Sequence, residues 1–199
     1  MTELSNSVIS DHEMKVRNLE LKGLKLVELD LYSDARGFFT ERFTASKFEA
    51  LGLFTNFIQD NHSRSLPNVI RGIHYQYDPP QNKLVGVIRG SIWDVAIDLR
   101  PNSPTFKKYF AMELSDKNGF LLWIPFGFAH GFCTLGEEPA DVMYKVDSLY
   151  NPKTSCGIHW ADPELKIPWP VNKNPIVSKA DAELPTLAYF QENLAHHLA

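Results

Sequence analysis

Residues 91–99 read SIWDVAIDL and carry the clearest local structural signal in the chain. Positions 93, 95, 97 and 99 are apolar, whereas Asp94 and Asp98 lie between them. Alternation with a period of two residues is typical of a β-strand, because successive side chains point to opposite faces of a sheet. The segment therefore predicts a strand with one face toward the core and its two acids on the other face.

Similar short runs, rich in β-branched and aromatic residues, occur along most of the chain. Turn-forming sequences such as DARG, RGS, DKNG and GEEPA separate them. The further strand-like runs lie at 25–32, 37–43, 57–63, 68–76, 83–88, 107–115, 120–125, 130–136 and 141–150. So many short strands in a chain of 199 residues predict an all-β fold, either a double-sheet jelly roll or a barrel.

Three local patterns add connections to this picture. The pair Asn118-Gly119 predicts a tight hairpin between the strands on either side, because both residues tolerate the positive φ angles of a type I′ turn. The segment TASKFEALG at 44–52 predicts a short helix. Residues 178–198 predict one or two C-terminal helical pieces, interrupted at Pro185.

The composition is that of one globular domain without a strong electrostatic bias. Hydrophobic residues make up 44% of the chain, which is enough for a sizeable core. A net charge of -4 and an isoelectric point near 6.0 argue against nucleic acid as a partner. We expect residues 1–15 to form a flexible N-terminal tail and residues 16–199 to form a single domain.

The termini and the cysteines indicate a cytoplasmic protein. The first residues, MTELSNSVISDHEMK, are polar and acidic, unlike a signal peptide, and no apolar stretch approaches membrane length. We therefore expect no membrane partner. Cys133 and Cys156 form no C-x-x-C pair, which fits free thiols in a reducing compartment.

The stretch RGIHYQYDPPQNKLV at 71–85 holds the most informative histidine. His74 fits three roles: a metal ligand, a proton-transfer group or a hydrogen-bonded core residue. A metal site needs three or four converging ligands, but Tyr75 and Gln76 follow His74 where a companion is expected, and His130 supplies only a second ligand. The pattern favours proton transfer, for which histidine is suited by its pKa near neutrality, with core packing as the alternative.

Lys83 follows His74 across the turn at Pro79-Pro80. If the two runs pair, the turn brings the ammonium group beside His74, where it would stabilise negative charge on an oxygen. On spacing alone, a solvated turn lysine fits Lys83 better.

Several ordered blocks of sequence together carry a family resemblance. These blocks are DARGFFTERF, FIQDNHSRS, RGIHYQ, KLV, SIWDVAIDLRPNSPTF, LWIPFGFAHGF, DVMYKVDSLY and IHWADPELKIPWP. Between about residues 24 and 185 the chain resembles the dTDP-4-dehydrorhamnose 3,5-epimerase family of the cupin superfamily. The resemblance implies a cupin-type double-sheet jelly roll with short peripheral helices.

The resemblance also implies a reaction without metal or other cofactor. The family inverts C3 and C5 of dTDP-4-keto-6-deoxyglucose by removing and returning protons beside the ketone. His74 matches the base, Asp181 the acid that orients it, Lys83 the enolate stabiliser and Tyr144 the group that returns the proton. Without the resemblance, Asp181 fits a helix capping box with Ser178, and Tyr144 fits strand packing.

The resemblance extends to substrate binding and assembly. It implies a nucleotide-diphosphate sugar as substrate and a homodimer in which the segment 32–41 reaches the partner's site. The residues that match substrate-binding positions are Arg36, Phe39, Glu41, Gln59, Asn61, Arg71, His130 and Tyr150. From the residues alone, Arg71 also fits an exposed strand arginine.

Arg71 and His74 are an odd number of residues apart, so a regular strand would point them to opposite faces. If both serve one site, the pairing must be irregular, and Gly72 permits a bulge there. We therefore predict irregular strand pairing at Gly72.

The chain departs from the family pattern at two positions. Ser155 stands where a glutamate is common, and Gly86 where a basic residue is often found. The serine at 155 puts the family's contacts with the sugar in doubt. The glycine at 86 puts the family's usual contacts with the nucleotide in doubt. An epimerase that inverts only C3 or C5 of a related nucleotide-linked 4-keto sugar is therefore an alternative. A metal-dependent cupin enzyme and a non-catalytic sugar-binding cupin are further alternatives.

Overall fold

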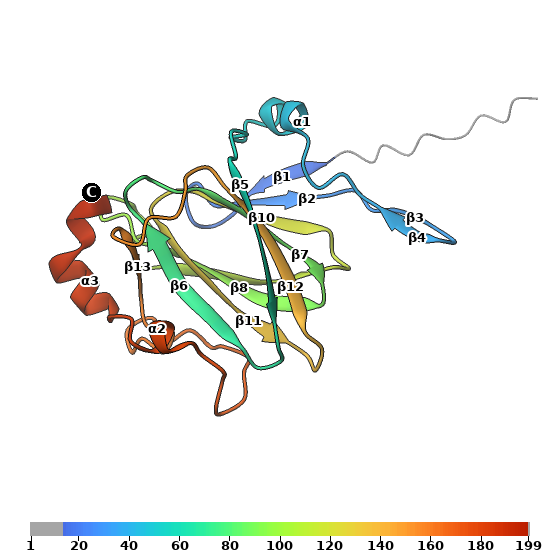
Figure 1. Cartoon of the computed structure of the whole chain (residues 1–199). Coiled ribbons are helices and arrows are strands. Elements are labelled where there is room, and N and C mark those ends of the chain that lie inside the picture. Colours follow the sequence, from blue (N-terminus) through green and yellow to red (C-terminus); the bar gives the residue numbers. More distant parts are fainter. Residues whose placement is uncertain (1–13, 199) are drawn as a thin grey trace, which may run out of the picture.

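The computed structural model describes residues 14–198, which form two β-sheets packed face to face (Figure 1). The six-stranded sheet has the order β1-β2-β10-β7-β12-β5, and the five-stranded sheet has the order β13-β6-β11-β8-β9. A separate hairpin, β3-β4, projects from the body of the molecule (Figure 1). Strand pairing within all three sheets is antiparallel.

The strands are short and the helices lie at the periphery. The strands are β1 (Lys15–Asn18), β2 (Lys25–Glu28), β3 (Tyr32–Asp34), β4 (Gly37–Phe39), β5 (Gln59–Ser65), β6 (Ile70–Gln76), β7 (Lys83–Arg89), β8 (Ser91–Asp98), β9 (Tyr109–Ser115), β10 (Phe120–Ile124), β11 (Phe128–Leu135), β12 (Ala140–Val146) and β13 (Ser155–Gly157). The helices are α1 (Ala45–Ala50), α2 (Lys179–Ala182), α3 (Leu187–Asn193) and the 3₁₀ helix η1 (Ala195–Leu198).

Every strand-like run of the sequence overlaps a strand, and both predicted helical regions are helical. β1 and β13 were not predicted, because their four and three residues are too short for a clear alternation. The single strand expected at 25–32 is divided into β2 and the first residue of β3. β1 begins at Lys15, the last residue of the predicted tail. Residues 1–13 of that predicted tail lie outside the described residues.

The core has three parts because both sheets are covered on more than one face. One cluster lies between the sheets and includes Val85 and Phe132. A second joins the outer face of the five-stranded sheet to α3 and includes Ile97 and Phe190. A third lies under α1, on the outer face of the six-stranded sheet, around Phe48. The C-terminal helices are seen beside β6 and β13 in Figure 1.

This layering corrects the expectation for β8 that only one face is buried. Asp94 and Asp98 are fully buried, as are the apolar residues on the opposite face such as Val95 and Ile97. The apolar face packs beneath the C-terminal helix, whereas the face with the acids points between the sheets. Local alternation identified the strand correctly but could not indicate that a helix covers its outer face.

The predicted hairpin at Asn118-Gly119 is wrong. β9 and β10 lie in different sheets, so the turn joins the two layers instead of pairing its flanking strands. Gly119 has a positive φ of 65°, and the side chain of Asn118 accepts hydrogen bonds from the backbone N–H groups of Ser115 and Phe120. The prediction of a turn at these two residues is confirmed. β10 does not pair with β9, because β2 and β7 occupy both of its edges.

No helix within residues 14–198 is long and apolar enough to span a membrane.

Candidate active site

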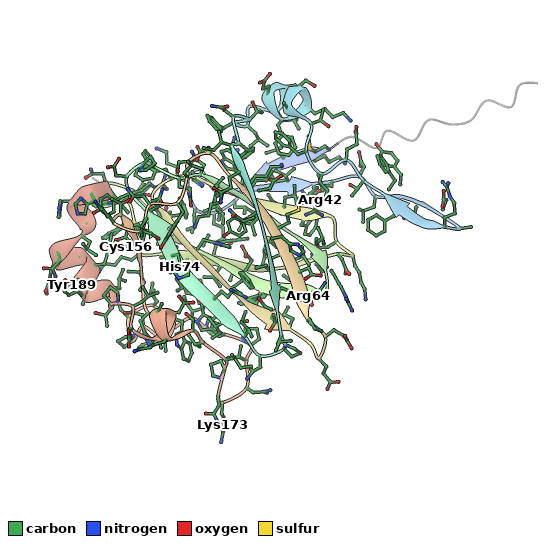
Figure 2. The ribbon with its side chains drawn as sticks, in the orientation of Figure 1. Arg42, Arg64, His74, Cys156, Lys173 and Tyr189 are labelled. Carbon is green, nitrogen blue, oxygen red and sulfur yellow. The ribbon has the colours of Figure 1, made fainter. Side chains whose placement is uncertain are left out.

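A cavity of about 740 Å³ opens between the two sheets and is lined by residues from both of them. It gathers His74, Lys83, Tyr144 and Asp181, the four residues expected to carry the chemistry. Three predicted binding residues, Arg71, His130 and Tyr150, line the same cavity. Figure 2 labels His74 on β6. Tertiary structure thus brings together residues spread over 110 positions of sequence.

The imidazole of His74 is held by the carboxylate of Asp181. His74 Nε2 lies 2.7 Å from Asp181 Oδ1, and the backbone N–H of Gly72 donates to Asp181 Oδ2 at 3.0 Å. Burial works to raise the pKa of Asp181, but the hydrogen bonds from His74 and Gly72 outweigh burial and lower it. The carboxylate is therefore ionised at neutral pH, and its hydrogen bond orients the imidazole of His74.

The capping alternative for Asp181 accounts for its backbone and not for its side chain. Ser178 is the N-cap of α2, and its hydroxyl accepts a hydrogen bond from the backbone N–H of Asp181. In a capping box the acid would reach back to the N-cap N–H. Here the carboxylate instead points to His74 and Gly72. The short helix thus serves to present Asp181 to the cavity.

The predicted irregularity at Gly72 is confirmed. His130 pairs with His74, whereas Phe132 pairs with Arg71, so β6 contains one more residue than β11 across this interval. Gly72 has a φ of 102°, and a Cβ atom there would lie 2.8 Å from the Cα of Gly131. Only glycine fits this close approach. The extra residue allows Arg71 and His74 to line one cavity.

Lys83 is a buried residue at the start of β7 and not a solvated turn lysine. Its ammonium group donates to the backbone carbonyl of His74 at 3.3 Å. Burial lowers the pKa of Lys83 to about 8, although the negative charge of Asp94 opposes this effect. A cation in this position would stabilise negative charge that develops on a substrate oxygen.

A second histidine–carboxylate pair lies beside the first, on the neighbouring strands of the five-stranded sheet. His130 Nε2 is 2.7 Å from Oδ1 of Asp94, and the other carboxylate oxygen, Oδ2, is buried without a protein hydrogen-bond partner. His130 is paired directly with His74 between β11 and β6. The role of Asp94 was not predicted, because strand alternation placed this acid on the face away from the core. An acid within an otherwise apolar strand was the signal that could have found it.

The two tyrosines differ in their surroundings. Tyr144 lies on β12 and packs against the core between the sheets. Burial raises the pKa of its hydroxyl, and the charge of Arg71 partly opposes this shift. The hydroxyl therefore keeps its proton at neutral pH, as a proton donor must. Tyr150 is 66% exposed at the rim of the cavity.

The guanidinium group of Arg71 is positioned by β5. Its Nε donates to the hydroxyl of Ser65 at 2.8 Å, and its Nη2 donates to the backbone carbonyl of Arg64 at 3.2 Å. Ser63 and Ser65 line the cavity and were missed by sequence reasoning. They continue the alternation that begins at Gln59 and Asn61, which was the available signal.

Five predicted binding residues do not line this cavity. Gln59 and Asn61 lie on β5 and bond to each other at 2.7 Å, with Asn61 opposite Tyr144 in the strand pairing. The remaining three, Arg36, Phe39 and Glu41, lie in or beside the projecting β3-β4 segment. Arg36 pairs with Asp34, Glu41 pairs with Lys47, and Phe39 is exposed. Within one chain, these three residues stand apart from the histidine dyad.

The two departures from the family pattern occupy different environments. Ser155 lines the cavity and pairs with Gln76 between β13 and β6. Gly86 faces away from the cavity, where a Cβ atom would lie 2.6 Å from Nη2 of Arg42 and 2.3 Å from Leu121. Gly86 therefore does not line this cavity. Arg42, seen in Figure 2 beside the six-stranded sheet, fills that space.

Residues 14–198 contain no group of three or more His, Cys, Asp or Glu side chains arranged to hold a metal ion. Each of the two cavity histidines has one carboxylate at hydrogen-bonding distance.

Comparison with known protein families identifies the family of this chain. Residues 18–189 match the family model described as dTDP-4-dehydrorhamnose 3,5-epimerase. The chain belongs to this epimerase family. A relative from Neisseria gonorrhoeae named dTDP-4-dehydrorhamnose 3,5-epimerase is 42% identical over 180 residues, which are 90% of this chain. The chain spans 55% of the length of that relative.

Solved structures of family members confirm the predicted cupin-type double-sheet jelly roll. The epimerase from Bacillus anthracis, with TDP and PPi bound, is 47% identical with a TM-score of 0.83, covering 87% of this chain and 99% of that one. The epimerase from Legionella pneumophila, in complex with dTDP-4-keto-L-rhamnose, is 43% identical with a TM-score of 0.84. That match covers 88% of this chain and 94% of the other.

Proposed function

We propose that the protein is a cofactor-independent epimerase that inverts C3 and C5 of dTDP-4-keto-6-deoxyglucose, a step in the synthesis of dTDP-L-rhamnose. Family membership supports the reaction class, and the named relatives support the substrate. The observation that carries the proposal is the His74–Asp181 pair at 2.7 Å inside a cavity that also holds Lys83 and Tyr144.

In this reaction His74 acts as the general base. Its imidazole takes the proton from the carbon next to the ketone, and the C–H bonding electrons move toward the carbonyl oxygen to form an enolate. Asp181 fixes the ring and stabilises the imidazolium that results. The buried ammonium group of Lys83 stabilises the negative oxygen, which is most effective in a site that excludes water.

The configuration inverts when the proton returns to the opposite face of the carbon. Tyr144 donates this proton from its hydroxyl, and its raised pKa keeps that hydroxyl protonated between turnovers. Tyr144 comes from the six-stranded sheet and His74 from the five-stranded sheet. A donor and a base on opposite walls of one cavity are what inversion of a carbon between them requires.

The nucleotide part of the substrate binds through the charged and aromatic groups of the same cavity. The fork of Arg71 suits a diphosphate because it donates parallel hydrogen bonds to two oxygens. His130 and Tyr150 complete the contacts from β11 and from the loop after β12. TDP and dTDP-4-keto-L-rhamnose are the ligands named for the two solved relatives.

The assembly is proposed to be a homodimer in which Arg36, Phe39 and Glu41 of one protomer meet the site of its partner. Phe38 and Phe39 are 56% and 65% exposed on the projecting hairpin, which supports burial against a second copy. Gln59 and Asn61 are proposed to approach the substrate near Tyr144. We further propose a single domain over residues 16–199 and a cytoplasmic location, where the free thiols of Cys133 and Cys156 would remain reduced.

Hydrogen exchange tests the proposal directly. The protein is incubated with dTDP-4-keto-6-deoxyglucose in deuterated water, and deuterium at C3 and C5 is measured by mass spectrometry and NMR. Incorporation at both carbons, lost at least ~100-fold in His74→Asn, is the expected result. Exchange at one carbon would instead identify a single-site epimerase. Activity that disappears with a tightly bound metal on chelation would identify a metal-dependent enzyme.

A further inference from the structure

Gln76 is a buried amide at the end of β6, two residues beyond His74 on the same strand. Its Nε2 donates to the carbonyl oxygens of Pro79 and Leu149, both at 3.0 Å. Its Oε1 accepts a hydrogen bond from the backbone N–H of Asn151 at 2.8 Å. One side chain therefore ties the loop after β12 to the end of β6 and to the turn that leads to β7.

The two loop contacts of Gln76 lie on either side of Tyr150. The side chain of Tyr150 itself is 66% exposed, and within residues 14–198 it makes no hydrogen bond, ion pair or ring contact. Its place at the cavity rim therefore depends on the path of its backbone. That path is fixed at Leu149 and Asn151 by the same amide, with Gln81 adding a hydrogen bond to the carbonyl of Ser148 at 2.9 Å.

We propose that Gln76 is a positioning residue that holds Tyr150 at the mouth of the cavity for contact with the nucleotide-sugar. The inference rests on the proposed function of the cavity. Gln76 suits this task because a neutral amide both donates to a carbonyl and accepts from an N–H, which a carboxylate or an ammonium group of similar length cannot do. Without it, the loop must order itself when substrate binds, and that ordering weakens binding.

Methionine tests the role because it is of similar length to glutamine and removes the hydrogen bonds without creating a large cavity. We expect Gln76→Met to raise the KM for the keto-sugar and the Kd for dTDP about tenfold, which corresponds to the loss of one or two net hydrogen bonds. The turnover at saturating substrate should change less than twofold. A substitution that merely loosened the fold would lower the melting temperature and leave KM unchanged.

A double-mutant cycle with Tyr150→Ala separates positioning from direct contact. If Gln76 acts through Tyr150, adding Gln76→Met to Tyr150→Ala raises Kd less than twofold further. If the two effects multiply, Gln76 acts without Tyr150 and the inference is overturned. Gln76→Glu keeps the acceptor for the N–H of Asn151 but sets a carboxylate against the carbonyl oxygens of Pro79 and Leu149, so it should raise Kd at least as much as Gln76→Met; it is the second variant should the methionine variant fail to fold.

Asn118→Ala is the matched control. Asn118 also holds a turn through backbone hydrogen bonds, to Glu113, Ser115 and Phe120, but it lies between β9 and β10 and away from the cavity. It should lose stability without a change in KM. Wild-type protein that neither binds dTDP nor exchanges hydrogen would refute the proposed function. Wild-type protein that does both, with an unaltered Kd in the Gln76 variants, would refute this inference alone.

Discussion

Replacement of Asp181 by asparagine removes one negative charge from the dyad and preserves the size of the side chain. Asp181 Oδ1 is 2.7 Å from His74 Nε2, which places the charge centres ~4 Å apart when the imidazole is protonated. At an effective dielectric constant of about 20, this gives about 4 kcal/mol. The side chain of His74 is 45% exposed, so solvent screening reduces the value to about 2 kcal/mol.

A loss of about 2 kcal/mol corresponds to a ~30-fold slower proton abstraction. The side-chain amide introduced by Asp181→Asn slows proton abstraction further, because it favours the wrong tautomer of the His74 imidazole. We therefore expect Asp181→Asn to slow deuterium incorporation at C3 and C5 by 30-fold or more, roughly 10²-fold in total. The assay is the initial rate of exchange with saturating dTDP-4-keto-6-deoxyglucose in deuterated water.

Ser178→Ala provides the control for this prediction. It removes the N-cap hydrogen bond of α2 and should cost about 1 kcal/mol of folding stability, measured by urea unfolding. Both side chains of the dyad remain in this variant, and the stronger hydrogen bonds of Asp181 to His74 and Gly72 are kept, so its exchange rate at saturating substrate should stay within about threefold of wild type. An Asp181→Asn variant that exchanges hydrogen as fast as Ser178→Ala would refute the reasoning, because Asp181 would then act only as part of a helix terminus.

Three further predictions concern other parts of the molecule. Tyr144→Phe should retain hydrogen exchange while losing at least ~10²-fold in formation of inverted product, measured by NMR; unchanged product formation would exclude Tyr144 as the donor. The turnover number should fall tenfold per pH unit above about 8, as Lys83 loses the proton that makes it a cation, and a profile that stays flat to pH 10 would contradict this. Asp162→Asn should lower the free energy of unfolding by roughly 2–4 kcal/mol, measured with urea, because this buried carboxylate accepts the backbone N–H groups of Glu164, Leu165 and Leu187. The same loss in the exposed control Glu164→Gln would rule out that explanation.

Much of the fold was predictable because strand periodicity is a local property. β7, β8 and β12 were identified from their residue patterns, and the helical region after residue 178 was divided correctly at Pro185. The bulge at Gly72 also followed from the sequence, since an odd spacing between two residues of one site requires an extra residue in the strand. The strand and helix inferences needed only the residue pattern of a single chain segment, whereas the bulge also needed the family resemblance, which implied that Arg71 and His74 serve one site.

Strand partners and the second face of each sheet could not be predicted in the same way. Asn118-Gly119 forms a turn in either case, but whether β9 pairs with β10 depends on the competition from β2 and β7. Asp94 is buried because the six-stranded sheet covers its face of β8, whereas the opposite, apolar face is covered by α3, about 90 residues later in the sequence. The local pattern of apolar and polar residues around a position does not reveal such long-range contacts.

For the site, the sequence by itself determined the residue types and, through family resemblance, the expected roles of His74, Asp181, Lys83 and Tyr144. Only the tertiary structure decided their distances, the burial that lowers the pKa of Lys83, the pairing of His130 with Asp94, and the path of the loop that carries Tyr150. The physical reason is that electrostatic and hydrogen-bond interactions depend on separation in space, and the two sheets bring together side chains that are far apart along the chain.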